Sequence, residues 1–235
     1  MSCETTGMKQ IALDIGVSVG PTLTNFYPGH NAAALAHIEL WMAGSTRSPV
    51  PTYLWGESGS GKTHLLKAVA EHIQGQGGMV GWMDASTTQA ETFNPEWEVL
   101  VLDDVQDYSA VQQHAAFNWF VNAATPGGSR QPWVLAAGQV PPQDLHLRED
   151  LRTRLGWGHV FHLQLLDDDQ RREVLVRHAQ ALGMALNNDL LDYLLTRFSR
   201  DLGHLMDLLQ RLDQFALQTQ RPLTIPLLRA MLDET

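Results

Sequence analysis

The sequence is almost free of cysteine, since Cys3 is the single one among 235 residues. One thiol cannot form a disulfide within the chain, nor can it build a thiolate metal site of the usual kind. This shortage suits a reducing compartment, and we expect a cytoplasmic protein. The ten histidines show no metal-ligand spacing with acids or with the cysteine, so we interpret them as surface or core-edge residues.

Long apolar runs and basic clusters are also missing. No stretch of about 18 apolar residues occurs, which argues against a membrane-spanning helix. The first residues lack a basic segment followed by an apolar one, which predicts no secretory signal peptide. Lys and Arg total 16 against 26 Asp and Glu, giving a net charge of −10. Because proteins that grip DNA phosphates usually carry a basic face, we expect no strong direct DNA binding.

A glycine-rich segment stands out against this background. Residues Gly56–Thr63 read G-x-x-x-x-G-K-T, the pattern of the phosphate-binding P-loop. The apolar, β-prone residues 53–55 precede it, and residues 63–73 after it are compatible with an amphipathic helix. Because the motif needs a strand before it and a helix after it, this context supports a phosphate site.

The residue types of the P-loop explain the chemistry. Glycines allow backbone N–H groups to approach phosphates closely, and the following helix N-terminus favours negative charge. Lys62 is expected to reach the β- and γ-phosphates, and Thr63 to offer its hydroxyl to Mg²⁺. The positions predicted to contact nucleotide are Gly56, Glu57, Ser58, Gly59, Ser60, Gly61, Lys62, Thr63 and His64.

A second motif lies about 40 residues further on. Residues 99–102 form an unbroken apolar run closed by Asp103 and Asp104. Such a run is typical of a strand buried on both faces of a parallel sheet. After a P-loop, an acid pair in this position indicates a Walker B motif. Asp103 is predicted to hold Mg²⁺ together with Thr63, and Asp104 to orient an attacking water.

The remaining pattern predicts an α/β domain followed by a small helical one. Further strands are expected near residues 79–83, 133–139 and 160–165, with helices between them. After Asp167 the pattern is helical throughout. We therefore predict a parallel five-stranded sheet flanked by helices, then an all-helical domain. The expected divisions are an N-terminal extension at 1–21, the α/β domain at 22–166 and the helical domain at 167–235.

Two features have competing interpretations. The period-two pattern of residues 11–19 favours an edge strand. The same region also contains Gln10, Leu13 and Ile15 in the form Q-x-x-L-x-aliphatic, which could dock extended into an apolar pocket of a partner. Arg154 and Arg200 are either surface arginines or groups that reach a phosphate, and Arg154 could do so in trans.

The order of these parts resembles the AAA+ ATPases, and among them the family of the bacterial replication initiator DnaA. The resemblance covers about residues 22–232 and is specific as a combination. The matching segments are Asn25–Asn31, Gly56–Thr63, Leu102–Gln106, Arg154–Gly158 and Arg200–Leu202.

Two differences from DnaA itself narrow the resemblance. The chain stops where DnaA continues into its helix-turn-helix domain, and residues 10–15 stand in place of the DnaA N-terminal domain. Residues 10–15 look like a sliding-clamp-binding peptide. This combination is similar to the DnaA regulatory inactivators, and it reverses the preference for an edge strand.

The resemblance implies an AAA+ module with a helical lid, loaded with ADP or ATP and Mg²⁺. It implies two partners, DnaA and the β sliding clamp of DNA polymerase III, and it also allows a homo-oligomer. Arg154 becomes a trans arginine finger that promotes hydrolysis of DnaA-bound ATP, which suppresses re-initiation. The positions assigned to nucleotide contact outside the P-loop are Phe26, Asn31, Gln139 and Arg200.

Three positions differ from the family pattern and bear on the expected rate of ATP hydrolysis. Gln139 occupies the sensor-1 position and Val140 follows it where a basic residue is common. Asp104 replaces the longer glutamate of vigorous AAA+ motors, so we expect slow intrinsic hydrolysis and retention of ADP. The alternatives are an autonomous ATPase of the helicase-loader type and, more weakly, a DNA-binding initiator variant.

Overall fold

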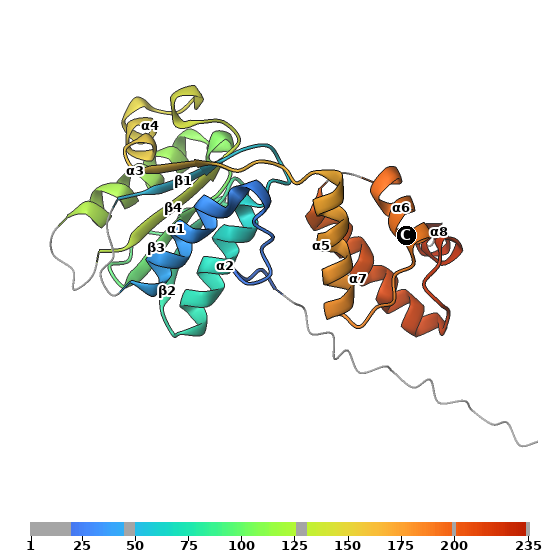
Figure 1. Ribbon diagram of the computed structural model, residues 1–235. Helices are drawn as coiled ribbons and strands as arrows, with labels where there is room; N and C mark the ends of the chain where they lie inside the picture. Colours follow the sequence, from blue (N-terminus) through green and yellow to red (C-terminus); the bar gives the residue numbers. More distant parts are fainter. Residues whose placement is uncertain (1–19, 45–49, 126–130, 199–200, 234–235) are drawn as a thin grey trace, which may run out of the picture. The chain divides into compact units, whose positions relative to one another are not determined.

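A computed structural model describes residues 20–44, 50–125, 131–198 and 201–233 (Figure 1). The chain divides into two compact units, one spanning Gly20–Arg171 and the other beginning at Arg172. Each unit is described by itself. The peptide predicted at residues 10–15 and the predicted nucleotide contact Arg200 lie outside the described residues.

The first unit is built on a sheet of five parallel strands in the order β2-β3-β4-β1-β5. This confirms the predicted sheet. The strands are β1 Thr52–Trp55, β2 Met79–Met83, β3 Trp97–Leu102, β4 Trp133–Gly138 and β5 His159–His162. Because β4 separates β3 from β1, the carboxyl ends of these three strands lie side by side. Parallel sheets bind ligands at this edge.

Helices cover both faces of the sheet (Figure 1). They are α1 Ala32–Ala43, α2 Lys62–Gly75, α3 Ala110–Ala124 and α4 Glu149–Gly156, with short 3-10 turns η1 Gly29–Asn31, η2 Val105–Asp107 and η3 Pro142–Asp144. Consecutive strand residues face opposite layers: Tyr53 packs with α3 and α4, and Leu54 with α1 and α2. Both layers are apolar, which explains the unbroken apolar runs seen in the sequence.

The second unit is entirely helical, as predicted. Helix α5 begins in the first unit, and the helices are α5 Asp168–Ala181, α6 Asn188–Arg197, α7 Leu202–Thr219 and α8 Ile225–Asp233. Their core is rich in leucine, including Leu194, Leu209 and Leu228, all fully buried. No helix among the described residues is long and apolar enough to cross a membrane.

The start of α6 shows how a polar side chain caps a helix. The capping residue is Asn187, and not the neighbouring Asn188 or Asp189. Its backbone is extended, so its side chain turns back and accepts a hydrogen bond of 2.7 Å from the amide of Leu190. Asn188 is already helical, and a helical residue cannot bond the amide groups of its own first turn in this way.

Candidate nucleotide-binding site

The P-loop connects the end of β1 to the start of α2, as the motif requires. Gly59 and Gly61 have φ values of 82° and 93°, in the left-handed region where side chains are strained. A Cβ atom at Gly61 would also lie 2.7 Å from the ring of Phe26. A Cβ atom at Gly56 would collide with the carbonyl oxygen of Leu163. The loop can therefore keep this path only with glycine at these positions.

Lys62 is folded back into the loop. Its ammonium donates hydrogen bonds to the carbonyl oxygens of Gly56 at 2.7 Å and Glu57 at 2.8 Å. Burial lowers the pKa of Lys62, while the nearby charges of Asp104 and Asp103 act in the opposite direction. Carbonyl oxygens satisfy the donors but carry no net charge. A buried ammonium in this setting is suited to anionic phosphate oxygens.

Thr63 and Asp103 meet although 40 positions separate them in the sequence. The Thr63 hydroxyl donates to Oδ2 of Asp103 at 2.7 Å, and Asp103 is buried. Burial raises the pKa of Asp103, opposed by the Thr63 hydrogen bond and assisted by the charge of Asp104. A hydroxyl and a carboxylate are oxygen ligands of the kind that Mg²⁺ prefers, and Mg²⁺ completes its shell with phosphates and water.

A protein-only metal site is not found in the described part of the chain. No group of three or more His, Cys, Asp or Glu side chains there could hold a metal ion. Thr63 and Asp103 would therefore hold a cation only together with the oxygens of a bound nucleotide. Their chemistry fits that role.

Replacing Asp103 with asparagine is expected to separate stability from cation binding. The amide oxygen can accept from the Asp104 N–H, and the amide nitrogen can donate to the Thr63 hydroxyl. Because the native pKa of Asp103 is raised, its charged form disfavours folding once the pH rises through that pKa. At neutral pH the variant should melt at the same temperature or a few degrees higher.

The same Asp103→Asn variant should bind Mg²⁺-nucleotide roughly tenfold more weakly, because hydrogen bonds to charged groups are the stronger ones. Thermal melts without ligand and nucleotide titrations with and without Mg²⁺ measure the two effects. A marked loss of stability without ligand, or unchanged Mg²⁺-dependent binding, would contradict this assignment.

Asp104 follows directly and lies immediately before the turn η2. Its backbone is left-handed, with φ 49° and ψ 46°, a conformation that aspartate tolerates better than most residues. Its amide donates to Oδ1 of Asp103 at 3.0 Å, which fixes the two acids relative to each other. The side chain of Gln106 donates to Oδ1 of Asp104 at 3.3 Å. Sequence reasoning missed Gln106 as a site residue, although it belongs to the Leu102–Gln106 segment.

Phe26 and His64 lie at the P-loop. Phe26 is buried against Gly61, and its ring centroid is 5.6 Å from that of His64. His64 Nε2 lies 3.0 Å from the carbonyl oxygen of Thr22. Burial lowers the pKa of His64, which favours the neutral imidazole. These contacts hold the segment before α1 against the phosphate loop.

Asn31 contacts the chain after β5, whereas Phe26 packs against the P-loop. Its amide nitrogen donates to the carbonyl oxygen of Gln164 at 2.9 Å, and its amide oxygen accepts from the N–H of Gln164 at 2.8 Å. Asn31 is buried, so this pairing anchors η1 to the chain after β5. The structure thus uses the Asn31 amide for backbone contacts.

Arg154 lies near the end of α4, on the face of the sheet that α3 also covers. Its guanidinium carbon is 5.2 Å from the ring centroid of Phe117, and that of Arg148 is 5.4 Å from the same centroid. Within the described residues Arg154 has no carboxylate partner. The aromatic face supports this half-buried cation without neutralising it.

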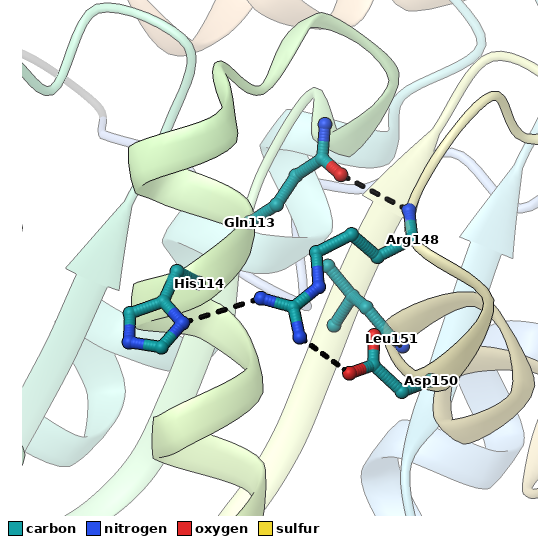
Figure 2. A network of polar contacts seen from close by, with 5 residues as sticks. All are labelled: Gln113, His114, Arg148, Asp150 and Leu151. Carbon is teal, nitrogen blue, oxygen red and sulfur yellow. Dashed lines mark hydrogen bonds and ion pairs between the residues drawn. The ribbon is translucent and has the colours of Figure 1, made fainter.

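Arg148, by contrast, is firmly anchored to α3 (Figure 2). Its backbone N–H donates to the side-chain oxygen of Gln113 at 3.0 Å. Its guanidinium lies 3.2 Å from Nδ1 of His114 and 2.7 Å from a carboxylate oxygen of Asp150. These contacts fix the start of α4 against α3, so the helix that carries Arg154 is held at both its buried face and its first turn.

The parallel sheet, the P-loop and the paired acids define a P-loop nucleotide-binding protein of the AAA+ class. Residues 168–232 match the family model described as Hda, lid domain. An uncharacterized protein of Haemophilus influenzae is 33% identical over 234 residues, covering 96% of this chain and 99% of that protein. The chain belongs to the DnaA-related AAA+ family that carries the Hda lid domain.

Solved structures agree with this assignment of the fold. Domain III of DnaA from Thermotoga maritima superposes with a TM-score of 0.69 at 19% identity, covering 91% of this chain and 95% of that one. AMPPCP-bound DnaA from Aquifex aeolicus gives a TM-score of 0.62 at 19% identity, covering 83% of this chain and 72% of that one.

Proposed function

We propose that this protein is a nucleotide-loaded adaptor that binds the DNA-loaded sliding clamp. While bound to the clamp, the adaptor stimulates hydrolysis of the ATP that DnaA carries. The observation that carries the proposal is Arg154, a guanidinium supported on Phe117 and lacking a carboxylate partner among the described residues. The Hda lid match and the likeness to DnaA support DnaA as the partner. AAA+ modules of like fold can pair so that an arginine of one completes the site of the next.

The nucleotide of this chain has a separate role. The P-loop, Lys62, Thr63 and Asp103 would hold ADP or ATP with Mg²⁺. The carboxylate of Asp104 is short and is already engaged by Gln106. We therefore propose slow intrinsic turnover, with the bound nucleotide supporting the assembly-competent form. Gln139 and Arg200 remain proposed contacts of that nucleotide, and Phe26 and Asn31 remain proposed neighbours of its base.

The stimulated reaction takes place at the nucleotide of DnaA. Water attacks the γ-phosphorus, and the bond to the bridging oxygen of the β-phosphate breaks, leaving ADP. One proton of the water stays on the attacking oxygen, and the other passes to another oxygen of the released phosphate. Negative charge accumulates on the transferred oxygens and the leaving oxygen. The Arg154 guanidinium is always charged and planar, so it can donate two parallel hydrogen bonds to these oxygens. Its contribution is electrostatic stabilisation of the transition state.

A reconstituted reaction tests this function. DnaA carrying radiolabelled ATP is incubated with DNA-loaded clamp and with this protein, and conversion to ADP is followed. We expect fast conversion only when both are present. The double variant Gln10→Ala, Leu13→Ala should lose stimulation and clamp pull-down but keep nucleotide binding, because only the peptide anchors are removed.

The alternative outcomes are informative. Normal clamp binding by the double variant would remove the tether from the proposal. Rapid ATP hydrolysis by this chain alone, with no effect on DnaA-bound ATP, would favour an autonomous ATPase of the helicase-loader type. Salt-sensitive binding to duplex DNA in the absence of clamp would favour the DNA-binding initiator variant.

A further inference from the structure

The end of β4 lies between the two halves of the candidate site. In the sheet, β4 pairs with β3 on one side and with β1 on the other. Gln139, the first residue after β4, therefore lies between the P-loop and the paired acids. The amide of Gly56 donates to the carbonyl oxygen of Gly138 at 3.3 Å, so the P-loop and the β4 end are in direct contact. The Gln139 side chain is exposed.

The backbone after β4 is held from two further directions. The Tyr53 hydroxyl donates to the carbonyl oxygen of Val140 at 2.8 Å. The side-chain oxygen of Gln106 accepts from the backbone N–H of Gln139 at 3.0 Å. Gly138 makes this approach possible, because a Cβ atom there would lie 3.2 Å from the Gln106 oxygen and would collide with the Tyr53 hydroxyl.

The nitrogen of the Gln106 side-chain amide contacts two acidic residues. The Gln106 nitrogen donates to Asp107 at 2.7 Å and to Asp104 at 3.3 Å. The Gln106 side chain thus joins Asp104 of the Walker B pair to Gln139, the residue after β4. Its nitrogen donates to Asp104, and its oxygen accepts from the N–H of Gln139. A carboxylate could not donate to Asp104, and an apolar side chain could make neither contact.

We propose that Gln106 is a positioning residue through which the site distinguishes a nucleoside triphosphate from a diphosphate. The inference rests on the proposed binding of nucleotide at the P-loop. The first two phosphates meet the P-loop backbone and Lys62. A third phosphate extends toward the ends of β3 and β4, where Asp104 and Gln139 lie. Gln106 fixes these two residues relative to each other, so its loss affects the third phosphate selectively.

Gln106→Met tests the proposal, because methionine keeps the length of the side chain and removes all three hydrogen bonds of the side-chain amide. Dissociation constants for ADP and for AMPPCP, both with Mg²⁺, are measured on the full chain by calorimetry. We expect binding of AMPPCP to weaken about three- to tenfold and binding of ADP to change by less than about twofold. These figures correspond to the loss of about one hydrogen bond.

Gln112→Met provides a matched control. The Gln112 amide donates to the carbonyl oxygens of Asp84 and Thr87 at 2.9 Å each, so it too bridges separate segments. It belongs to the capping box of α3 and contacts neither acid of the Walker B pair. The control should melt at a lower temperature but keep the ratio of the two dissociation constants.

A double-mutant cycle keeps the test independent of the folding of one variant. Gln139→Ala at an exposed position should weaken AMPPCP selectively, and adding Gln106→Met should weaken it by less than Gln106→Met does alone, because part of the Gln106 effect acts through the placement of Gln139. Equal weakening of both nucleotides, an unchanged ratio, or additive losses would overturn the inference. If the wild-type protein binds neither ADP nor AMPPCP, the proposed function is contradicted as well. If it binds both and the variants keep the wild-type ratio of the two dissociation constants, only the inference about Gln106 is contradicted.

Discussion

Lys62→Ala is expected to weaken nucleotide binding about 100-fold. The Lys62 ammonium is buried in the P-loop and bonded only to uncharged oxygens, the closest being the carbonyls of Gly56 and Glu57. A bound phosphate would give it charged acceptors instead, and hydrogen bonds between charged groups contribute about 1.5–3 kcal/mol each. Two such bonds account for a change of about two orders of magnitude.

Titration with a fluorescent ADP analogue measures the effect of Lys62→Ala. The stabilisation that nucleotide confers in a thermal melt should disappear in the variant, since ligand stabilisation depends on the ratio of ligand concentration to Kd. Lys67→Ala is the matched control, because Lys67 lies on the same helix but is exposed to solvent. If Lys62→Ala bound nucleotide as tightly as Lys67→Ala, the P-loop would not be the binding site.

Arg154→Ala is expected to reduce the stimulation of DnaA-bound ATP hydrolysis about 1,000-fold, the lower range for loss of an arginine finger. The variant should keep its own nucleotide affinity, since the guanidinium lies on α4 over Phe117 and makes no hydrogen bond to the P-loop. Clamp binding should also be unchanged. Single-turnover hydrolysis with DnaA preloaded with labelled ATP separates the chemical step from the exchange of nucleotide.

Two companion variants sharpen the test of Arg154. Arg154→Lys keeps the positive charge but loses the planar pair of donors, so it should recover only a small part of the activity. Arg152→Ala removes an arginine two positions earlier, which lies on a different face of the short helix α4. Full activity of Arg154→Ala, or an equal loss in Arg152→Ala, would contradict the role given to Arg154.

The fold could be predicted from local patterns. Residues 99–102 are apolar without interruption because both faces of β3 are covered, and the P-loop is recognisable from eight consecutive residues. The leucines of the lid recur at helical spacing, as Leu205, Leu208, Leu209 and Leu212 do in α7. In each case the pattern that reveals the element spans only a few consecutive positions, so it is visible in the sequence alone.

The details of the site required the tertiary structure. Asn31 pairs with the backbone of Gln164, 133 positions away, and Gln106 reaches Gln139 across 33 positions. A sequence pattern does not predict which hydrogen-bond partner a polar side chain will have where several strand ends lie together. The sequence alone predicted that Arg154 is a functional arginine through its family resemblance, but not that Phe117 supports it.

The sequence by itself determined the parallel sheet, the phosphate loop and the helical lid, because helix and strand periodicity and glycine conformation are local properties. The tertiary structure decided that Lys62 turns onto its own loop, that Thr63 meets Asp103, and that Gln106 joins the ends of β3 and β4. These contacts exist only after the strand order has brought distant residues to one edge of the sheet.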